Sequence, residues 1–251
     1  MPLLQVRELS KDFAGLRALE GVSFSAEAGS ILGIIGPNGA GKTTLFNIIS
    51  GTYRPTGGEV LFQERNILGM KPHQISHLGI GRTFQIVRPL NNLDVETNVL
   101  VAFGHRIYPS LWKSFGPCRR PQPLQEVRSL VERAGLRPYL NTPARNLPLG
   151  YKKRLEIARA LALEPRLLLL DEPSGGLRHE ESYQLMELIR MLRDQGIGVL
   201  LIEHNMPVVM DLCERIVVLD HGSKIAEGPP EEIRSNPKVI EAYLGRETQN
   251  A

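Results

Sequence analysis

A glycine-rich run that follows an apolar stretch constrains the fold of this chain more than any other feature. The apolar residues 31–35 lead directly into Gly36-Pro37-Asn38-Gly39-Ala40-Gly41-Lys42-Thr43, which fits the pattern G-x-x-x-x-G-K-[ST]. Glycines allow the backbone to turn so that several N–H groups point at one anion. Residues 42–50 have a helical pattern, and the start of a helix adds the positive end of its dipole. The run therefore predicts a strand, a phosphate-binding loop and a helix, in that order.

The residue types in this loop fit a nucleoside triphosphate. Lys42 supplies a positive charge for the β and γ phosphates, and the hydroxyl of Thr43 can bind Mg²⁺. A glycine-rich turn with a chance lysine is the alternative, but it leaves the flanking strand and helix unexplained. The loop residues that we expect to bind the nucleotide are Gly36, Pro37, Asn38, Gly39, Ala40, Gly41, Lys42, Thr43 and Thr44.

The composition is that of an ordinary globular protein. The chain has 251 residues, of which 42% are hydrophobic and 23% charged, and its net charge is +3. This charge is too small to indicate a nucleic-acid partner by itself. Cys118 and Cys213 are far apart and show no metal-ligand spacing, so neither a disulfide scaffold nor a zinc site is expected.

The sequence contains no apolar run that approaches the roughly 20 residues a helix needs to cross a bilayer. The polar residues Gln5, Arg7 and Glu8 interrupt the short apolar start, so no signal-peptide core is expected. We therefore expect the chain to lie in the cytoplasm, and to work at a membrane only if a partner holds it there.

Continuous apolar strands alternate with helical patterns along most of the chain. Strands that stay apolar without alternation indicate a parallel sheet that is covered on both faces. Residues 22–26 differ, since they alternate with a period of two. The expected strands are 3–9, 22–26, 31–35, 60–62, 167–170, 199–202 and 216–219, and the expected helices around them are 42–50, a short one from 72 to 78, and 180–195.

The middle of the chain is helical in character. Its helical patterns are at 94–103, 124–134 and 150–163, and a segment rich in Pro, Gly and Arg lies at 104–123. We therefore predict a single α/β domain: a P-loop core with a mostly parallel sheet, an N-terminal antiparallel β portion and an inserted α-helical subdomain. The expected core lobe comprises residues 1–88 and 164–251, and the expected helical subdomain comprises about 89–163.

Two acidic residues close another apolar strand. Leu167-Leu168-Leu169-Leu170 is followed directly by Asp171 and Glu172. A buried parallel strand presents its last residues at the carboxyl edge of the sheet, where ligands bind in such folds. Asp171 is suited to hold Mg²⁺, directly or through water, and Glu172 is suited to polarise a water for attack on the γ phosphate. The alternative is a strand end with two solvated acids.

These motifs together resemble the ATP-binding subunit of an ABC transporter, over essentially the full length of the chain. The resemblance implies ATP and Mg²⁺ as the cofactors and an ATPase activity coupled to transport. It gives Asp171 the metal-binding Walker B position and Glu172 the catalytic-base position. It also places Ser174-Gly175-Gly176-Leu177 at the family's D-loop.

Three further residues match positions of this family. Gln85 matches a glutamine that ends the strand leading into the helical subdomain, so the resemblance implies catalytic and metal-binding roles for it. His204 matches a catalytic switch histidine, and Phe13 matches an aromatic residue that stacks on adenine. Each has a plainer alternative: a core aromatic for Phe13, a surface polar residue for Gln85, and a locally hydrogen-bonded histidine for His204. The remaining histidines (73, 77, 105, 179 and 221) match no motif and are expected to be solvated.

One family motif matches poorly. The signature Leu-Ser-Gly-Gly-Gln reads here Leu147-Pro148-Leu149-Gly150-Tyr151, although the segment after it fits better. Pro148 has neither a hydroxyl nor an N–H to offer to a phosphate. The helix that follows still offers its dipole and the backbone donors from Leu149 onward. Binding of ATP from a facing subunit is therefore weakened in principle but not excluded.

Details of the sequence narrow the resemblance. Residues 79–85, 154–159 and 236–245 resemble the ATPase subunits of importers for branched-chain or other hydrophobic amino acids. The alternatives are an ATPase of urea import or of lipopolysaccharide export, and a non-transport ABC ATPase acting on nucleic acid or ribosomes. The last would be expected to have tandem cassettes, a coiled-coil insertion or a basic stripe.

The resemblance implies partners as well. They are two transmembrane permease subunits, a second ATPase subunit in a head-to-tail sandwich (homodimer or heterodimer), and indirectly an extracytoplasmic solute-binding protein. No nucleic acid is expected. The implied location is peripheral, on the cytoplasmic side of the inner membrane.

Overall fold

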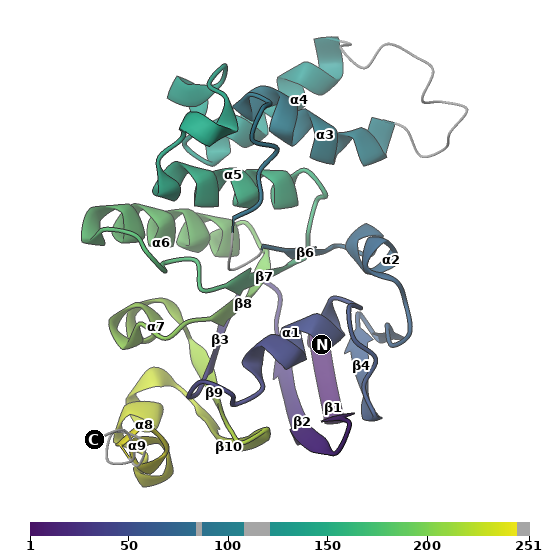
Figure 1. Ribbon diagram of the computed structural model, residues 1–251, viewed down its shortest axis with the longest axis vertical. Coiled ribbons are helices and arrows are strands. Elements are labelled where there is room, and N and C mark those ends of the chain that lie inside the picture. Colours follow the sequence, from purple (N-terminus) through teal and green to yellow (C-terminus); the bar gives the residue numbers. More distant parts are fainter. Residues whose placement is uncertain (84–86, 108–120, 245–251) are drawn as a thin grey trace.

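Two β-sheets and the helices around them form the structure, a computed structural model that describes residues 1–83, 87–107 and 121–244 (Figure 1). The smaller sheet is antiparallel throughout, and the larger is parallel except for the edge pair β10–β9. The smaller sheet has the order β2 (Leu16–Ala26), β1 (Leu4–Phe13), β4 (Gly57–Phe62), β5 (Arg65–Asn66). The larger has the order β10 (Ser223–Gly228), β9 (Arg215–Asp220), β3 (Ile31–Ile35), β8 (Gly198–Ile202), β7 (Leu167–Asp171), β6 (Ile80–Arg82).

The central strand β3 shows why the strands of the larger sheet are apolar without alternation. Successive side chains of a strand point to opposite faces. Ile31 and Ile35 therefore join one apolar cluster, while Leu32 and Ile34 join the other. All five residues of β3 are buried, because both faces of the sheet are covered. This arrangement confirms the parallel sheet that the sequence predicts.

Different elements cover the two faces. Helix α1 (Lys42–Ile49) contributes Leu45 and Phe46 to the cluster that also contains the inner face of the smaller sheet. The opposite face is covered by α5 (Leu149–Leu161), α6 (His179–Asp194) and α7 (Met206–Leu212). The phosphate-binding loop lies between β3 and α1, so its two ends are anchored in the core.

The helical region stands on the second face of the larger sheet. Helices α3 (Val95–Ile107) and α4 (Pro121–Arg133) pack on each other and on α5 (Figure 1). Val99 of α3, Val127 of α4 and Leu168 of β7 belong to one continuous apolar cluster. The helical region and the sheet therefore share a core. Short helices complete the chain at Pro72–His77 (α2), Arg137–Tyr139, Ala144–Asn146, Pro230–Ser235 (α8) and Pro237–Leu244 (α9).

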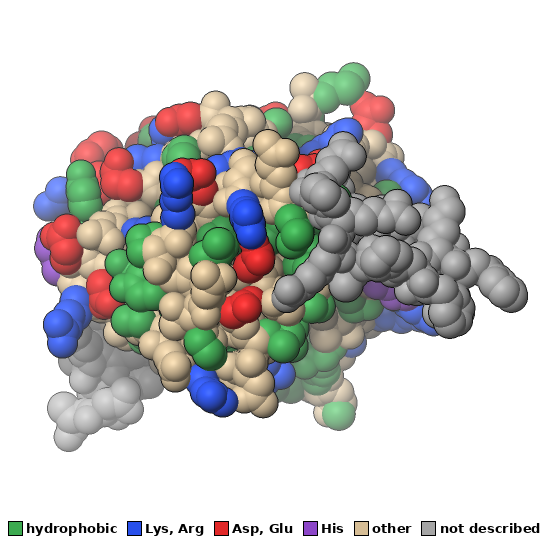
Figure 2. All heavy atoms as spheres, turned by 90° about the horizontal axis from the view of Figure 1, so that it is seen from above, with side chains coloured by type: hydrophobic (Ala, Val, Ile, Leu, Met, Phe, Trp, Pro, Cys, Tyr) green, Lys and Arg blue, Asp and Glu red, His purple; other side chains and the backbone are tan. Residues whose placement is uncertain are grey.

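The surface over α3 and α4 carries charges of both signs. Figure 2 shows Lys and Arg side chains interspersed with Asp and Glu side chains and with apolar ones on this face. Arg128 of α4, for example, pairs with Glu96 of α3 at 2.6 Å. Among the helices of the described ranges, none has the length and apolarity that crossing a bilayer requires.

The fold class predicted from the sequence is confirmed, and residues 220–223 form a hairpin turn at the edge of the larger sheet. β9 and β10 pair Asp220 with Ser223, so the loop has two residues, His221 and Gly222. Both have positive φ angles, 45° and 80°, as a two-residue hairpin turn of this hand requires. The pattern of apolar runs did not indicate β6, α7, α8 or α9.

Candidate active site

The loop between β3 and α1 depends on glycine at several positions. Gly36, Gly39 and Gly41 have φ angles of 148°, 82° and 101°, a region that other residues rarely adopt. A Cβ atom on Gly36 would lie 2.0 Å from the carbonyl oxygen of Leu219, and one on Gly41 would lie 2.5 Å from that of Ala18. A Cβ on Gly39 would meet no atom within 4 Å. Both ends of the loop therefore pack against neighbouring backbone, and the middle of the loop is open.

Lys42, the first residue of α1, is held inside the curve of this loop. Its Nζ donates hydrogen bonds to the carbonyl oxygens of Gly36 and Pro37, at 2.6 and 2.9 Å. The side chain is buried, so its positive charge is only weakly screened by solvent. The loop thus combines a fixed ammonium group with the N-terminus of a helix, which is the arrangement that binds phosphate.

A cavity of about 550 Å³ lies over the loop, which is a usual size for a small-molecule site. The end of β1, the turn after it, the loop itself and Glu172 surround it. Its lining residues are Phe13, Leu16, Arg17, Ala18, Asn38, Gly39, Ala40, Gly41, Lys42, Thr43, Thr44, Glu172 and His221. The structure thus brings together Phe13, most of the loop and Glu172, as the sequence predicts.

Phe13 lies at the edge of this cavity and is only partly buried. The ring of Tyr53 approaches it edge-on, with centroids 5.4 Å apart, and the Nζ of Lys11 lies 4.6 Å from its centroid. These contacts orient an aromatic ring at the surface of the cavity. Such a ring offers a face on which a base can stack.

Asp171 ends β7 in a buried position. Only 5% of the residue is exposed, so the alternative of two solvated acids does not hold for it. Oδ2 lies 3.7 Å from Nη2 of Arg82, whose Nη1 also donates to Asn47 and Ser50. Burial raises the pKa of Asp171, while Arg82 and Lys42 act to lower it. Asp171 lines a separate small cavity, together with Thr83 and Lys153.

Glu172 follows Asp171 in an unusual backbone conformation. Its φ is +46°, which is rare for a residue other than glycine. Its N–H donates to the carbonyl oxygen of Ile202 at 2.9 Å, which ties it to the neighbouring strand β8. His204, just beyond β8, places Nδ1 3.6 Å from Oε2 of Glu172. The strand ends thus bring together two residues that the sequence selected separately.

Sequence reasoning missed three charged residues around Asp171, Glu172 and His204. Glu203 is fully buried and accepts hydrogen bonds from the backbone N–H groups of Ser174 and His204, at 2.8 and 3.2 Å. Lys153 donates from Nζ to the carbonyl oxygen of Glu172 at 2.9 Å. Arg82 is the third. A signal existed for Glu203, because it directly follows an apolar strand, as Asp171 does.

The signature region forms a helix start, as expected. Pro148 is the N-cap of α5, and its carbonyl accepts from the N–H of Lys152 at 3.0 Å. Leu149 is 41% exposed, so the first turn reaches the surface. A Cβ on Gly176 would lie 3.1 Å from Leu149, which places the D-loop segment against this helix start.

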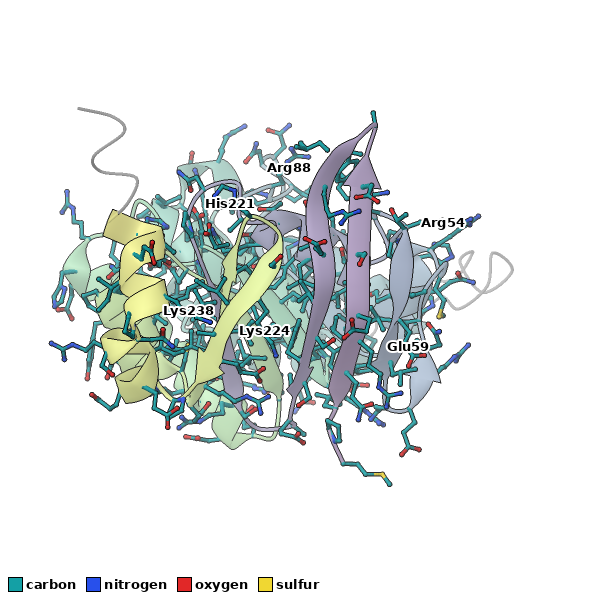
Figure 3. All side chains as sticks on the ribbon, turned by 90° about the horizontal axis from the view of Figure 1, so that it is seen from below. Arg54, Glu59, Arg88, His221, Lys224 and Lys238 are labelled. Atoms are coloured by element: carbon teal, nitrogen blue, oxygen red, sulfur yellow. The ribbon has the colours of Figure 1, made fainter. Side chains whose placement is uncertain are left out.

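Gln85 lies outside the described residues, so its predicted role stays a prediction. His221, expected only to be solvated, does have a side chain that is 80% exposed, yet it lines the cavity over the loop (Figure 3). The β9–β10 turn carries it there, because the N–H of Gly222 donates to the carbonyl oxygen of Ala40 at 3.2 Å.

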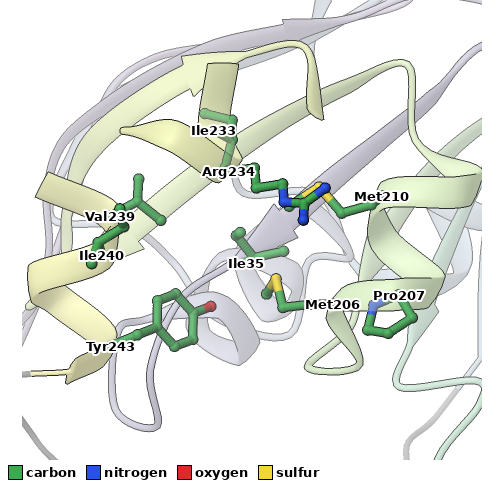
Figure 4. Close-up of a pocket in the computed structure, with 9 residues that line it drawn as sticks. All are labelled: Ile35, Met206, Pro207, Met210, Ile233, Arg234, Val239, Ile240 and Tyr243. Carbon is green, nitrogen blue, oxygen red and sulfur yellow. The ribbon is translucent and has the colours of Figure 1, made fainter. Parts of the chain in front are cut away.

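A second, mainly apolar cavity of about 580 Å³ lies between α7 and the two C-terminal helices (Figure 4). Burial raises the pKa of Tyr243, which lines it, to about 12. The other lining residues are Ile35, Met206, Pro207, Met210, Ile233, Arg234, Val239 and Ile240. Ile35, which lines this cavity, directly precedes the phosphate-binding loop.

Comparisons with known proteins agree with this geometry. The ABC transporter family model matches residues 19–175, and a model for branched-chain amino acid ATP-binding cassette transporters matches residues 223–248. The high-affinity branched-chain amino acid transport ATP-binding protein LivG of Salmonella typhimurium is 44% identical over 250 residues, 97% of this chain and 98% of the relative. The corresponding protein BraF of Pseudomonas aeruginosa is 41% identical over 97% of this chain and 98% of the relative.

Solved structures extend the comparison to the fold. An ATP-binding cassette of an ABC transporter, in its ADP conformation, superposes with a TM-score of 0.87 at 31% identity and covers 98% of this chain and 99% of that one. A dimeric cassette bound to ADP and Pi gives a TM-score of 0.76 at 25% identity, over 90% of this chain and 98% of that one. The chain therefore belongs to the ABC transporter family, as one of its ATP-hydrolysing subunits.

Proposed function

We propose that this chain hydrolyses ATP to energise an importer of branched-chain or other hydrophobic amino acids. Two observations support the substrate class: the match of residues 223–248 to the branched-chain model, and relatives named for this transport at 41–44% identity. The lipopolysaccharide export ATP-binding protein LptB of Acidithiobacillus ferridurans is 34% identical over 98% of each chain. The higher identity of the amino-acid transport proteins favours import.

The cavity over the phosphate-binding loop is the proposed ATP site. Lys42 would pair with the β and γ phosphates, and the loop from Gly36 to Thr44 would donate its N–H groups to them. Phe13 would stack on the adenine. The Lys42 ammonium, buried at the base of this cavity, is the single observation that carries the assignment most directly.

The residues near the loop also fit a magnesium ion. Mg²⁺ in nucleotide sites takes one or two protein oxygens and fills the remaining positions with phosphate and water. Thr43 offers a hydroxyl, and the buried Asp171 offers a carboxylate within the electrostatic reach of Lys42. Gln85 is a further proposed ligand, on the resemblance alone. When bound, the ion would neutralise charge on the phosphate oxygens.

Hydrolysis itself is assigned to Glu172 and His204. Glu172 lines the cavity and would orient and deprotonate the attacking water. His204 lies within 3.6 Å of the same carboxylate, where it can hold that carboxylate and respond to the γ phosphate. Gln85 is a further proposed catalytic residue, on the resemblance alone.

The proposed assembly follows from the family and from dimeric relatives. Solved dimers of related cassettes support a pair of ATPase chains, which we propose to be arranged head to tail. We propose that two permease subunits hold this pair at the cytoplasmic face of the membrane, and that a solute-binding protein delivers the amino acid from outside. The chain itself would comprise a core lobe, residues 1–88 and 164–251, and a helical subdomain of about 89–163.

Uptake measurements test the proposal directly. Cells that lack this chain should import labelled leucine, isoleucine and valine poorly, and the wild-type gene should restore import. The Lys42→Ala variant should not, because it lacks the charge that binds the phosphates. Lys238→Met, a substitution of an exposed lysine on α9, serves as the control (Figure 3).

Two results would contradict the substrate class. One is normal uptake of all three amino acids in cells without the chain, and the other is a loss confined to urea. Permease subunits should also co-purify with the chain from native membranes, and their identification would show which transporter it serves.

A further inference from the structure

Lys153 links two elements that are far apart in the sequence. It lies in the second turn of α5, and only 8% of the residue is exposed. Its Nζ donates to the carbonyl oxygen of Glu172, which follows β7, at 2.9 Å. A Cβ on Gly175 would lie 3.7 Å from the same Nζ. The ammonium group therefore sits inside the turn that begins at Glu172.

The backbone of Glu172 needs such support. Its left-handed conformation, with φ at +46°, is unfavourable for a residue that carries a side chain. Such strain persists only where the surroundings hold it. The N–H of Glu172 is fixed to Ile202, and its carbonyl oxygen accepts from Lys153 and from the N–H of Gly175 at 3.2 Å. Lys153 supplies the charged member of these contacts.

A buried carboxylate balances the lysine. Glu203 is fully buried, and its field, with that of Glu172, acts against the burial that lowers the pKa of Lys153. Glu203 also accepts from the backbone of Ser174 and of His204. Burying two opposite charges contributes little to stability, because both must lose their water. Lys153 and Glu203 thus hold the backbone around Glu172 through separate hydrogen bonds rather than adding to the core.

We propose that Lys153 is a positioning residue for ATP hydrolysis. Its ammonium, balanced by Glu203, holds Glu172 in the conformation from which the carboxylate reaches the cavity over the phosphate-binding loop. This inference rests on the proposed function of that cavity. Lys153 belongs to the helix that begins at the signature. In the proposed dimer that helix start faces the ATP of the other chain, so a shift of α5 would move Glu172 in its own site.

The test measures ATP hydrolysis by the full chain, purified with the subunits that accompany it. Lys153→Met should lower kcat by about 10- to 100-fold, since misplacement by about 1 Å has that effect. The KM for ATP should stay within about twofold, because Lys153 does not line the ATP cavity. Lys153→Arg, which keeps the charge, should recover part of the rate. Lys238→Met is the matched control. Rates are expressed per nucleotide-binding site, so a smaller folded fraction does not lower them.

Two more variants keep the inference testable if Lys153→Met folds poorly. Lys153→Met with Glu203→Gln leaves no unpaired buried charge, and should show the same loss of kcat. In a Glu172→Gln background, Lys153→Met should lower the residual rate less than about twofold, because the residue it positions is already disabled.

Certain results would overturn the inference. They are a kcat in the double variant equal to that of the control, or an equal loss with and without the Glu172 carboxylate. A failure of the wild-type preparation to hydrolyse ATP would instead refute the proposed function, and this inference with it.

Discussion

The imidazole of His204 lies beside the carboxylate of Glu172, with Nδ1 3.6 Å from Oε2, where the adjacent strands β7 and β8 end. The two side chains differ in environment, since 64% of the histidine side chain is exposed but only 24% of the glutamate. The carboxylate is thus anchored at the sheet edge, and the imidazole stands on its solvent side. Mutating each residue alone and both together therefore tests whether they act as one unit.

Glu172→Gln should keep ATP binding but slow hydrolysis by about 10²- to 10⁴-fold, because the amide cannot accept a proton from water. His204→Ala should also slow hydrolysis, and the double variant should lose little more than Glu172→Gln alone, since both act on one carboxylate. Nucleotide titration and steady-state rates measure the two effects. Normal turnover by the Glu172→Gln protein, free of contaminating ATPases, would refute the assignment.

Alanine substitutions at Gly36 and Gly39 should affect different properties of the protein. Gly36→Ala should mainly reduce stability, and Gly39→Ala should mainly weaken ATP binding. Gly36→Ala should lower the free energy of unfolding by about 3 kcal/mol or more, because its Cβ would overlap the carbonyl of Leu219. Gly39→Ala has open space and should cost only about 1–2 kcal/mol, for its positive φ. It should instead weaken ATP binding, since the methyl group enters the open side of the loop. Urea unfolding and ATP titration separate the cases. Equal stability of the two variants would show that Gly36 is not sterically required.

Pro148→Ser should raise ATP hydrolysis at one site only. The N-cap of α5 has no side-chain hydrogen bond to offer, and a missing donor to phosphate costs on the order of 10²–10³ in rate. We hypothesise a heterodimer in which the P-loop of the partner faces this poor signature, while the P-loop of this chain faces a regular one. Single-site turnover, with the catalytic glutamate of each chain neutralised in turn, measures each site. Equal rates before the substitution, or no gain after it, would exclude the asymmetry.

Cys213 should make the protein less stable at alkaline pH. Burial raises the pKa of its thiol from 9.0 to about 12 in the folded state. The folded chain therefore keeps a proton that the unfolded chain loses, so this stability is complete below pH 9 and is lost as pH rises toward 12. At pH 10.5 the loss is about 2 kcal/mol. Denaturant unfolding should show this extra slope in the wild type but not in Cys213→Ala. Parallel pH profiles of the two proteins would disprove it.

Much of the fold could be predicted because the apolar runs are local signals. β3 occupies the expected residues 31–35, because the apolar run is bounded clearly by Gly36. β6 could not be found in this way: three residues, Ile80–Arg82, form a strand only because β7 pairs with them. Helix α7 has only seven residues, too few for a clear helical periodicity.

The same distinction between local and long-range signals applies to the candidate site. The phosphate-binding loop, Asp171 and Glu172 belong to short motifs, so the sequence locates them without the fold. Lys153 reaches Glu172 from an element that is distant in the sequence, and only the folded chain shows the contact. The roles given to these residues, and to Phe13, Gln85 and His204, stay predictions.

The position of β3 in the sequence affects folding during synthesis of the chain. β3, at residues 31–35, pairs with β8 at Gly198–Ile202 and with β9 at Arg215–Asp220. During synthesis from the N-terminus, the phosphate-binding loop therefore leaves the ribosome long before either neighbour of its strand exists. An apolar strand without its partners is prone to aggregate. Residues 31–35 therefore lack both neighbouring strands until about residue 220 has emerged, and a product truncated before that point cannot complete its central sheet.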